Sequence, residues 1–122
     1  MIRTKGLTHI HLVVRSMKRS LRFYQAVFGM AVRFKIGRKM VFLNTPGSRD
    51  TITLNENPDL AGIAGTSGGI SHFGFELVKG DLDAAIQEVE KAGGKLVERG
   101  EHAPSVPYAY VADPDGYVIE LG

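Results

Sequence analysis

Residues 7–14 read Leu-Thr-His-Ile-His-Leu-Val-Val, an alternation that predicts a β-strand. Ser16 is a candidate N-cap for a helix over about 17–28, and Gly29 supplies the residue that helix C-termini favour. Three further short strands are predicted near 31–36, 39–44 and 51–55. The first half of the chain therefore reads as a strand, a helix and three strands.

The second half repeats this order. Residues 71–78 read Ser-His-Phe-Gly-Phe-Glu-Leu-Val, and Asp81 is placed to cap a helix that ends at Gly93. Further strands are predicted near 95–98, 107–112 and 117–121. The distance from His9 to His72 is 63 residues, and a strand-led repeat of that period indicates two copies of one supersecondary unit.

We therefore predict an α+β fold of two tandem βαβββ modules that form a half-barrel, or cup. A generic ferredoxin-like domain is the alternative. The chain of 122 residues suits a single domain, with module one at about 5–56, a glycine-rich connector at 57–69 and module two at about 70–122. An open half-barrel leaves strand edges to cover, so a homodimer is expected.

Charge is divided unequally along the chain. Residues 1–49 hold eleven Lys and Arg and no acid, whereas the remaining 73 residues hold four bases and thirteen acids. The net charges are about +11 and −9, so the halves should attract each other within one chain or across a dimer. The bases are scattered singly through apolar sequence, which argues against nucleic-acid binding.

Composition excludes several other classes. With no cysteine, the chain has no disulfide scaffold, thiolate metal site or cysteine nucleophile. No apolar run is long enough to span a bilayer, and residues 1–6 do not resemble a secretory leader. We expect a cytoplasmic protein that acts on a small molecule, with no nucleic-acid or membrane partner.

The strand faces suggest a metal site. Because side chains alternate across a strand, His9, His72 and Glu120 each lie opposite the apolar face of their strand. If the modules curl into a half-barrel, the three side chains converge inside the cup. Two imidazoles and a carboxylate suit a divalent ion and leave coordination positions open. The alternative for each histidine is an ordinary hydrogen-bonded residue.

Three motifs resemble the vicinal oxygen chelate superfamily, the group of glyoxalase I, extradiol dioxygenases, and fosfomycin- and bleomycin-resistance proteins. The helix ends Phe-Tyr-Gln-Ala-Val-Phe-Gly-Met at 23–30, the second module opens Ile-Ser-His-Phe-Gly-Phe at 70–75, and the chain closes Asp-Pro-Asp-Gly-Tyr-Val-Ile-Glu-Leu at 113–121. The resemblance covers nearly the whole chain. It implies that His9, His72 and Glu120 are the metal ligands.

Departures from the resemblance narrow the chemistry. Glyoxalase I has a fourth ligand, a glutamate in the fourth strand of module one, where parity places Thr53 here. Glu56 has the wrong parity for that role unless a bulge intervenes. Fosfomycin-resistance transferases have a catalytic threonine where this chain has His11. Bleomycin-binding relatives have lost the metal ligands, whereas this chain retains all three.

Two further residues are candidate catalytic groups. His11 lies one pleat from His9 on the same face, within reach of a chelated substrate as an acid or base. Tyr110 shares a face with Tyr108 on the seventh strand and can donate a phenolic hydrogen bond into the cup. His102 lies in the stretch 100–107, which we predict to be a loop, so it is either a lid residue or a surface residue.

The function expected from these residues is that of a metal-dependent enzyme whose ion chelates two neighbouring oxygens of a small substrate. We favour extradiol-dioxygenase-like chemistry, because two histidines and one carboxylate suit Fe²⁺; Zn²⁺, Mn²⁺, Ni²⁺ and Co²⁺ are alternatives. A glyoxalase-type lyase or isomerase is the second hypothesis. A metal-free protein that binds a drug or metabolite is the third.

Overall fold

The computed structural model describes residues 1–61, 69–78 and 80–122. Its elements follow the predicted order: β1 (Ile10–Val14), α1 (Met17–Phe28), β2 (Ala31–Ile36), β3 (Met40–Asn44), β4 (Ile52–Glu56), β5 (Phe73–Phe75), α2 (Leu82–Lys91), β6 (Lys95–Ala103), β7 (Val106–Ala112) and β8 (Val118–Leu121). The α+β prediction with two βαβββ modules is confirmed. The predicted connector falls largely on residues 62–68, outside the described residues.

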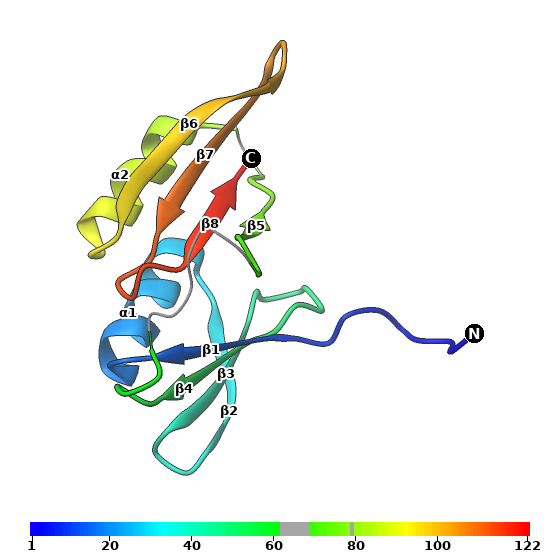
Figure 1. Ribbon diagram of the computed structural model, residues 1–122, viewed down its shortest axis with the longest axis vertical. Coiled ribbons are helices and arrows are strands. Elements are labelled where there is room, and N and C mark those ends of the chain that lie inside the picture. The colour runs from blue at the N-terminus through cyan, green and yellow to red at the C-terminus, as the bar shows by residue number, and fades with distance from the viewer. Residues whose placement is uncertain (62–68, 79) are drawn as a thin grey trace.

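Each module forms its own four-stranded sheet. Sheet A has the order β1-β4-β3-β2 and sheet B the order β5-β8-β7-β6, so both repeat one topology. In each sheet the first strand runs parallel to the last one and the other pairs are antiparallel. Figure 1 shows sheet B in the upper half of the view and sheet A in the lower half, with α1 near their junction and α2 beside β6.

Local sequence signals place α1. Ser16 is its N-cap and accepts a hydrogen bond from the Arg19 amide, and Gly29 ends it in the left-handed conformation with φ 62°. Phe23 and Tyr24 on its inner face are fully buried. Burying two aromatic side chains of this size is a large part of what holds the helix on the sheet.

The apolar strand faces predicted from alternation are buried. Leu12 and Val14 of β1 and Ile119 and Leu121 of β8 are at most 5% exposed and belong to one core. The opposite parity carries His11, which is exposed, and Glu120, which is partly exposed. For these residues of β1 and β8 the alternation predicted the faces that the structure shows.

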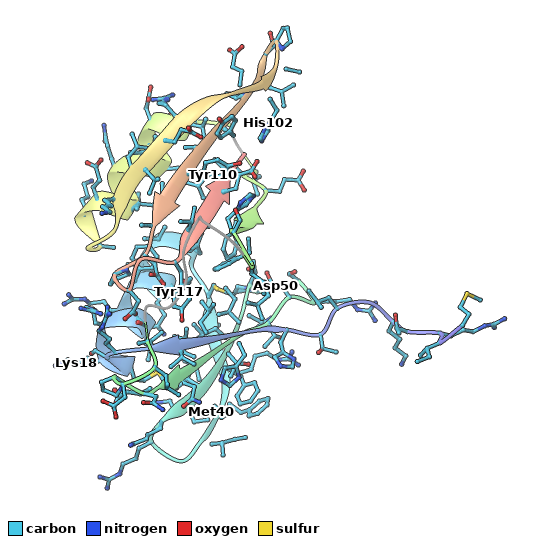
Figure 2. All side chains as sticks on the ribbon, in the orientation of Figure 1. Lys18, Met40, Asp50, His102, Tyr110 and Tyr117 are labelled. Atoms are coloured by element: carbon cyan, nitrogen blue, oxygen red, sulfur yellow. The ribbon has the colours of Figure 1, made fainter. Side chains whose placement is uncertain are left out.

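Contacts between the modules are partly aromatic and partly polar. The rings of Phe28 in α1 and Phe75 in β5 stack with centroids 4.0 Å apart. The Tyr117 hydroxyl donates a 2.6 Å hydrogen bond to the carbonyl of Val13, and Tyr117 lies between the two sheets (Figure 2). β1 and β5 are outer strands of their sheets, and no strand pairing joins the two sheets in the described part of the chain.

Candidate metal centre

The two sheets carry equivalent rows of side chains. In sheet B the strand register aligns one residue from each strand: Glu98, Tyr110, Glu120 and Gly74. In sheet A the equivalent row is Phe34, Phe42, Thr53 and His11. Thr53 therefore stands in module one where Glu120 stands in module two, as parity predicted. Thr53 is buried, and its hydroxyl has no hydrogen-bond partner among the described residues.

Glu120 lies between two imidazoles. His102 Nε2 is 2.6 Å from its Oε1, and His72 Nε2 is 3.1 Å from its Oε2. The hydrogen bond from His102, together with the nearby imidazoles, lowers the pKa of Glu120 below its usual value. The carboxyl group is therefore ionised at neutral pH and available as an anionic ligand.

A hydroxyl precedes each predicted histidine ligand and contacts it in the same way. Thr8 Oγ1 lies 2.8 Å from His9 Nδ1, and Ser71 Oγ lies 2.8 Å from His72 Nδ1. In each ring the hydroxyl engages Nδ1, which leaves Nε2 as the atom that can bind a metal. A hydrogen bond at the second ring nitrogen is the usual way in which a protein orients a metal-binding histidine.

His9 and His11 lie apart from the Glu120 cluster. They line a cavity of about 680 Å³ together with His72, between β1 and the segment that leads into β5. Nevertheless, no group of three His, Asp or Glu side chains in the described residues is close enough to hold one metal ion. Within one chain the structure thus brings His72 and Glu120 together but not His9.

Tyr110 lies beside the cluster. It pairs with Glu120 across the strands, and its ring is 4.8 Å from that of His72. Loss of hydration, with the nearby Glu120 charge, raises the pKa of Tyr110. The phenol therefore keeps its proton at neutral pH and has a hydrogen to donate.

The sequence alone does not decide whether His102 is a lid residue or a surface residue. The stretch 100–107 is not a loop throughout: β6 continues to Ala103, and the hairpin turns at Ser105, which has φ 65°. The prediction failed because Gly100, Pro104 and Pro107 are typical of loops. The alternation of Glu98, Gly100 and His102 was a usable signal, since an extended strand places alternate residues on one face. Figure 2 shows His102 and Tyr110 on the side of sheet B away from α2.

Glu56 has a structural role. Its Oε2 accepts a 2.8 Å hydrogen bond from the backbone amide of Met17, at the start of α1. A carboxylate is stabilised there by unpaired amides and the helix dipole. Glu56 is thus held at the helix and not on the face that carries Thr53 and His11.

The fold and this arrangement agree with comparisons to known proteins. The family model described as Glyoxalase/Bleomycin resistance protein/Dioxygenase superfamily matches residues 6–121. The chain belongs to this superfamily, so the resemblance suggested by the sequence motifs is confirmed.

Among curated relatives, a catechol-2,3-dioxygenase from Bacillus subtilis is 35% identical, in an alignment that covers 93% of this chain and 41% of the relative. The chain thus spans less than half the length of that protein. A lactoylglutathione lyase from Neisseria meningitidis is 31% identical, in an alignment that covers 94% of this chain and 88% of the relative. The relatives therefore include both a dioxygenase and a lyase.

A solved fosfomycin resistance protein from Listeria monocytogenes has the same fold. Its TM-score is 0.79 at 21% identity, over 98% of this chain and 93% of that chain. At this identity the likeness concerns the fold alone.

Members of the superfamily typically bind a divalent metal. The donors present fit such an ion in part: Glu120 is ionised, and His72 has its Nδ1 engaged and its Nε2 beside the carboxylate. A third donor is needed to complete a His₂-carboxylate set.

No helix among the described residues has the length and apolar character required to cross a membrane.

Proposed function

We propose that this chain is a metal-dependent enzyme that opens the ring of a small catechol-type substrate, with Fe²⁺ as its metal. The observation that carries the proposal is the arrangement around Glu120, where His72 and His102 contact the two carboxylate oxygens and Tyr110 packs on His72. The set combines donors suited to a borderline divalent ion with groups able to hold and move protons.

The metal ion, when bound, supplies a chelation site for two neighbouring substrate oxygens and stabilises the charge that develops on them. Tyr110 donates a hydrogen bond to a substrate oxygen, a role consistent with its raised pKa. His102 holds a proton at Nε2 beside Glu120, and His11 is assigned to removing a proton from a substrate hydroxyl. Each assignment concerns a side chain on the face of its sheet opposite the helix.

We further propose that the site is completed in a homodimer, with His9 and its neighbour on the same strand, His11, supplied by the partner chain. This accounts for the separation of His9 from His72 and Glu120 within one chain. It also uses the charge asymmetry, because residues 1–49 of each copy, at about +11, would face the acidic remainder of the other. In the described part of the chain β1 and β5 each have one edge without a strand partner, and the sheets of the two copies would meet along these edges.

A glyoxalase-type lyase fits the residues less well. That chemistry needs a carboxylate base at the place where this chain has Thr53, and Glu56 is engaged with the Met17 amide instead. A metal-free binding protein would have no use for an ionised carboxylate between two imidazoles. We therefore retain ring cleavage as the proposed activity.

The test is reconstitution with Fe²⁺ under nitrogen, followed by catechol and dioxygen in an oxygen electrode. Ring cleavage consumes one dioxygen per catechol, inserts both oxygen atoms and gives a ring-opened product that absorbs visible light. Absence of oxygen uptake by fully iron-loaded protein with catechol and its alkyl derivatives would overturn the proposal. Conversion of a hemithioacetal with Zn²⁺ or Ni²⁺ would instead identify a lyase.

Glu120→Gln is the critical variant in this assay. It removes the anionic ligand while keeping the shape of the side chain, so we expect loss of bound iron and loss of oxygen uptake together. Glu90→Gln on the exposed face of α2 is the matched control, since it makes the same chemical change away from the cluster. It should retain both iron and activity.

A further inference from the structure

Tyr108 occupies a specific place on sheet B, directly over Gly100. The two residues face each other in the β6–β7 register. A Cβ atom on Gly100 would lie 3.0 Å from the Tyr108 hydroxyl oxygen and 3.2 Å from its Cε1 and Cζ atoms. A Cβ atom at position 100 would therefore require the ring to move by a few tenths of an ångström, so the glycine provides the room that the ring occupies.

Two further contacts hold the ring of Tyr108. Its hydroxyl donates a 3.1 Å hydrogen bond to Oε2 of Glu98. Its face stacks on the imidazole of His102, with centroids 4.2 Å apart and planes inclined by 17°. The ring is thus bounded by a strand backbone, a carboxylate and the histidine that contacts Glu120.

His102 needs such support because of where it lies. It is one residue from the end of β6, near the tip of a hairpin, and its side chain is 48% exposed. An imidazole at such a position is free to change rotamer unless a neighbour restricts it. Stacking on an aromatic ring is expected to raise the population of one orientation about two- to tenfold.

We propose that Tyr108 is a positioning residue that keeps His102 Nε2 on Oε1 of Glu120. Since His102 engages Oε1, the oxygen left to face His72 is Oε2. Through His102, Tyr108 thereby determines which oxygen of Glu120 is presented to the metal. The contacts run from Glu98 on β6 through Tyr108 on β7 to Glu120 on β8. This inference rests on the proposed function only in taking Glu120 as a ligand.

The first measurement is the NMR spectrum of the metal-free protein. The imidazole protons of His102, assigned with His102→Gln, are expected to be shifted upfield by the ring current of Tyr108. Tyr108→Phe keeps the ring and should keep the shift, whereas Tyr108→Leu and Gly100→Ala should reduce it. Phe34→Leu is the control, because it removes an exposed aromatic ring from sheet A.

The second measurement is a double-mutant cycle on Mn²⁺ affinity. Tyr108→Leu and His102→Gln are each expected to weaken binding about 10- to 100-fold, as loss of a group that orients a ligand does. If Tyr108 acts through His102, the double variant should bind Mn²⁺ no more weakly than His102→Gln alone does. Thermal unfolding of each variant identifies any that fails to fold, and Gly100→Ala then serves in place of Tyr108→Leu.

The outcomes separate this inference from the proposed activity. An unchanged His102 shift in a folded Tyr108→Leu variant overturns the positioning role, and so do losses of affinity that multiply in the double variant. A lost shift with a non-multiplicative cycle supports it, whether or not catechol is cleaved. Absence of ring cleavage alone would overturn only the proposed function.

Discussion

The hydroxyl of Tyr24 in α1 donates a 2.7 Å hydrogen bond to Oδ2 of Asp113 in the turn before β8. The bond joins module one to module two and is buried. The other oxygen, Oδ1, accepts hydrogen bonds from the amides of Asp115 and Tyr117. Asp113 thus shapes its own turn and ties that turn to the helix of the other module.

Asp115 makes a second connection of the same kind. Its side chain is fully buried and accepts hydrogen bonds from the Arg15 amide, the Arg19 guanidinium and the Ser20 hydroxyl. Buried charge is tolerated only when it is paired and hydrogen-bonded in this way. Two aspartates in the motif that closes the chain thus join module two to α1 and the residues before it, beside the contacts of Phe28 and Tyr117.

Tyr24→Phe is expected to lower the free energy of unfolding by about 1–3 kcal/mol, because Oδ2 of Asp113 is left buried without its partner. Urea unfolding followed by circular dichroism measures the change. Tyr108→Phe is the matched control: it also removes a hydroxyl, but from an exposed hydrogen bond, and should cost less. Equal losses in the two variants would show that the buried hydrogen bond between the modules contributes no more to the free energy of unfolding than an exposed one does.

Asp113 should also make stability depend on pH. Burial raises the pKa of Asp113 above 3.8, so the folded protein binds this proton more tightly than the unfolded chain does. The stabilisation that the proton on Asp113 gives to the folded protein is complete below pH 3.8 and is lost as pH rises through the folded-state pKa. The isosteric variant Asp113→Asn has no such proton, while its amide can still bond with Tyr24 and the turn amides.

The measurement is urea unfolding of wild type and Asp113→Asn at several values between pH 3.5 and 7. The stability of wild type relative to the variant should fall over this range and then level off. A difference that is constant with pH, or that grows in favour of wild type, would contradict the expected raised pKa. Using the difference between the two proteins cancels the titration of carboxyl groups that do not interact with Asp113.

Gly94 is required by close packing at the end of α2. A Cβ atom there would lie 2.5 Å from the Ala112 carbonyl oxygen, 2.7 Å from Val89 and 2.9 Å from Phe23. Gly94→Ala should therefore destabilise the protein by about 1–3 kcal/mol or more through overpacking. Gly80→Ala, where nothing lies within 4 Å, is the control and should be nearly neutral in the same thermal or urea unfolding experiment.

Local signals explain how much of the fold can be predicted. Ser16 and Gly29 bound α1 by side-chain and backbone conformational preferences alone, and alternation assigns Leu12 and Glu120 to opposite strand faces. The contact between His102 and Glu120 depends instead on how β6 and β7 pair beyond the point where the sequence resembles a loop. Pairing between strands is a non-local property that composition near residue 102 does not reveal.

Tyr110→Phe should lower kcat about 100-fold or more in the ring-cleavage assay, because the variant keeps the ring but has no proton to donate. Its iron content should match wild type, since the phenol is not among the proposed ligands. Tyr24→Phe, the same change outside the site, should retain kcat in the folded protein. Unchanged kcat in Tyr110→Phe would remove this residue from the mechanism.

A final prediction concerns the source of the third ligand. If His9 of one chain completes the site of the other, His9→Ala and Glu120→Ala dimers are each inactive, but a mixed dimer has one intact site. The intact site combines His9 from the Glu120→Ala chain with His72 and Glu120 from the His9→Ala chain. Random pairing from coexpression should then restore about a quarter of the wild-type activity and bound iron.

The same experiment has a clear opposite outcome. A site built within each chain carries one defect in every copy, so coexpression restores neither iron nor activity. The control is coexpression of His72→Ala with Glu120→Ala, whose two ligands lie 3.1 Å apart in the same module. That pair should not complement under either arrangement, because no mixed dimer contains both ligands in one module. Recovery in the first pair but not in the second would therefore assign His9 to the partner chain.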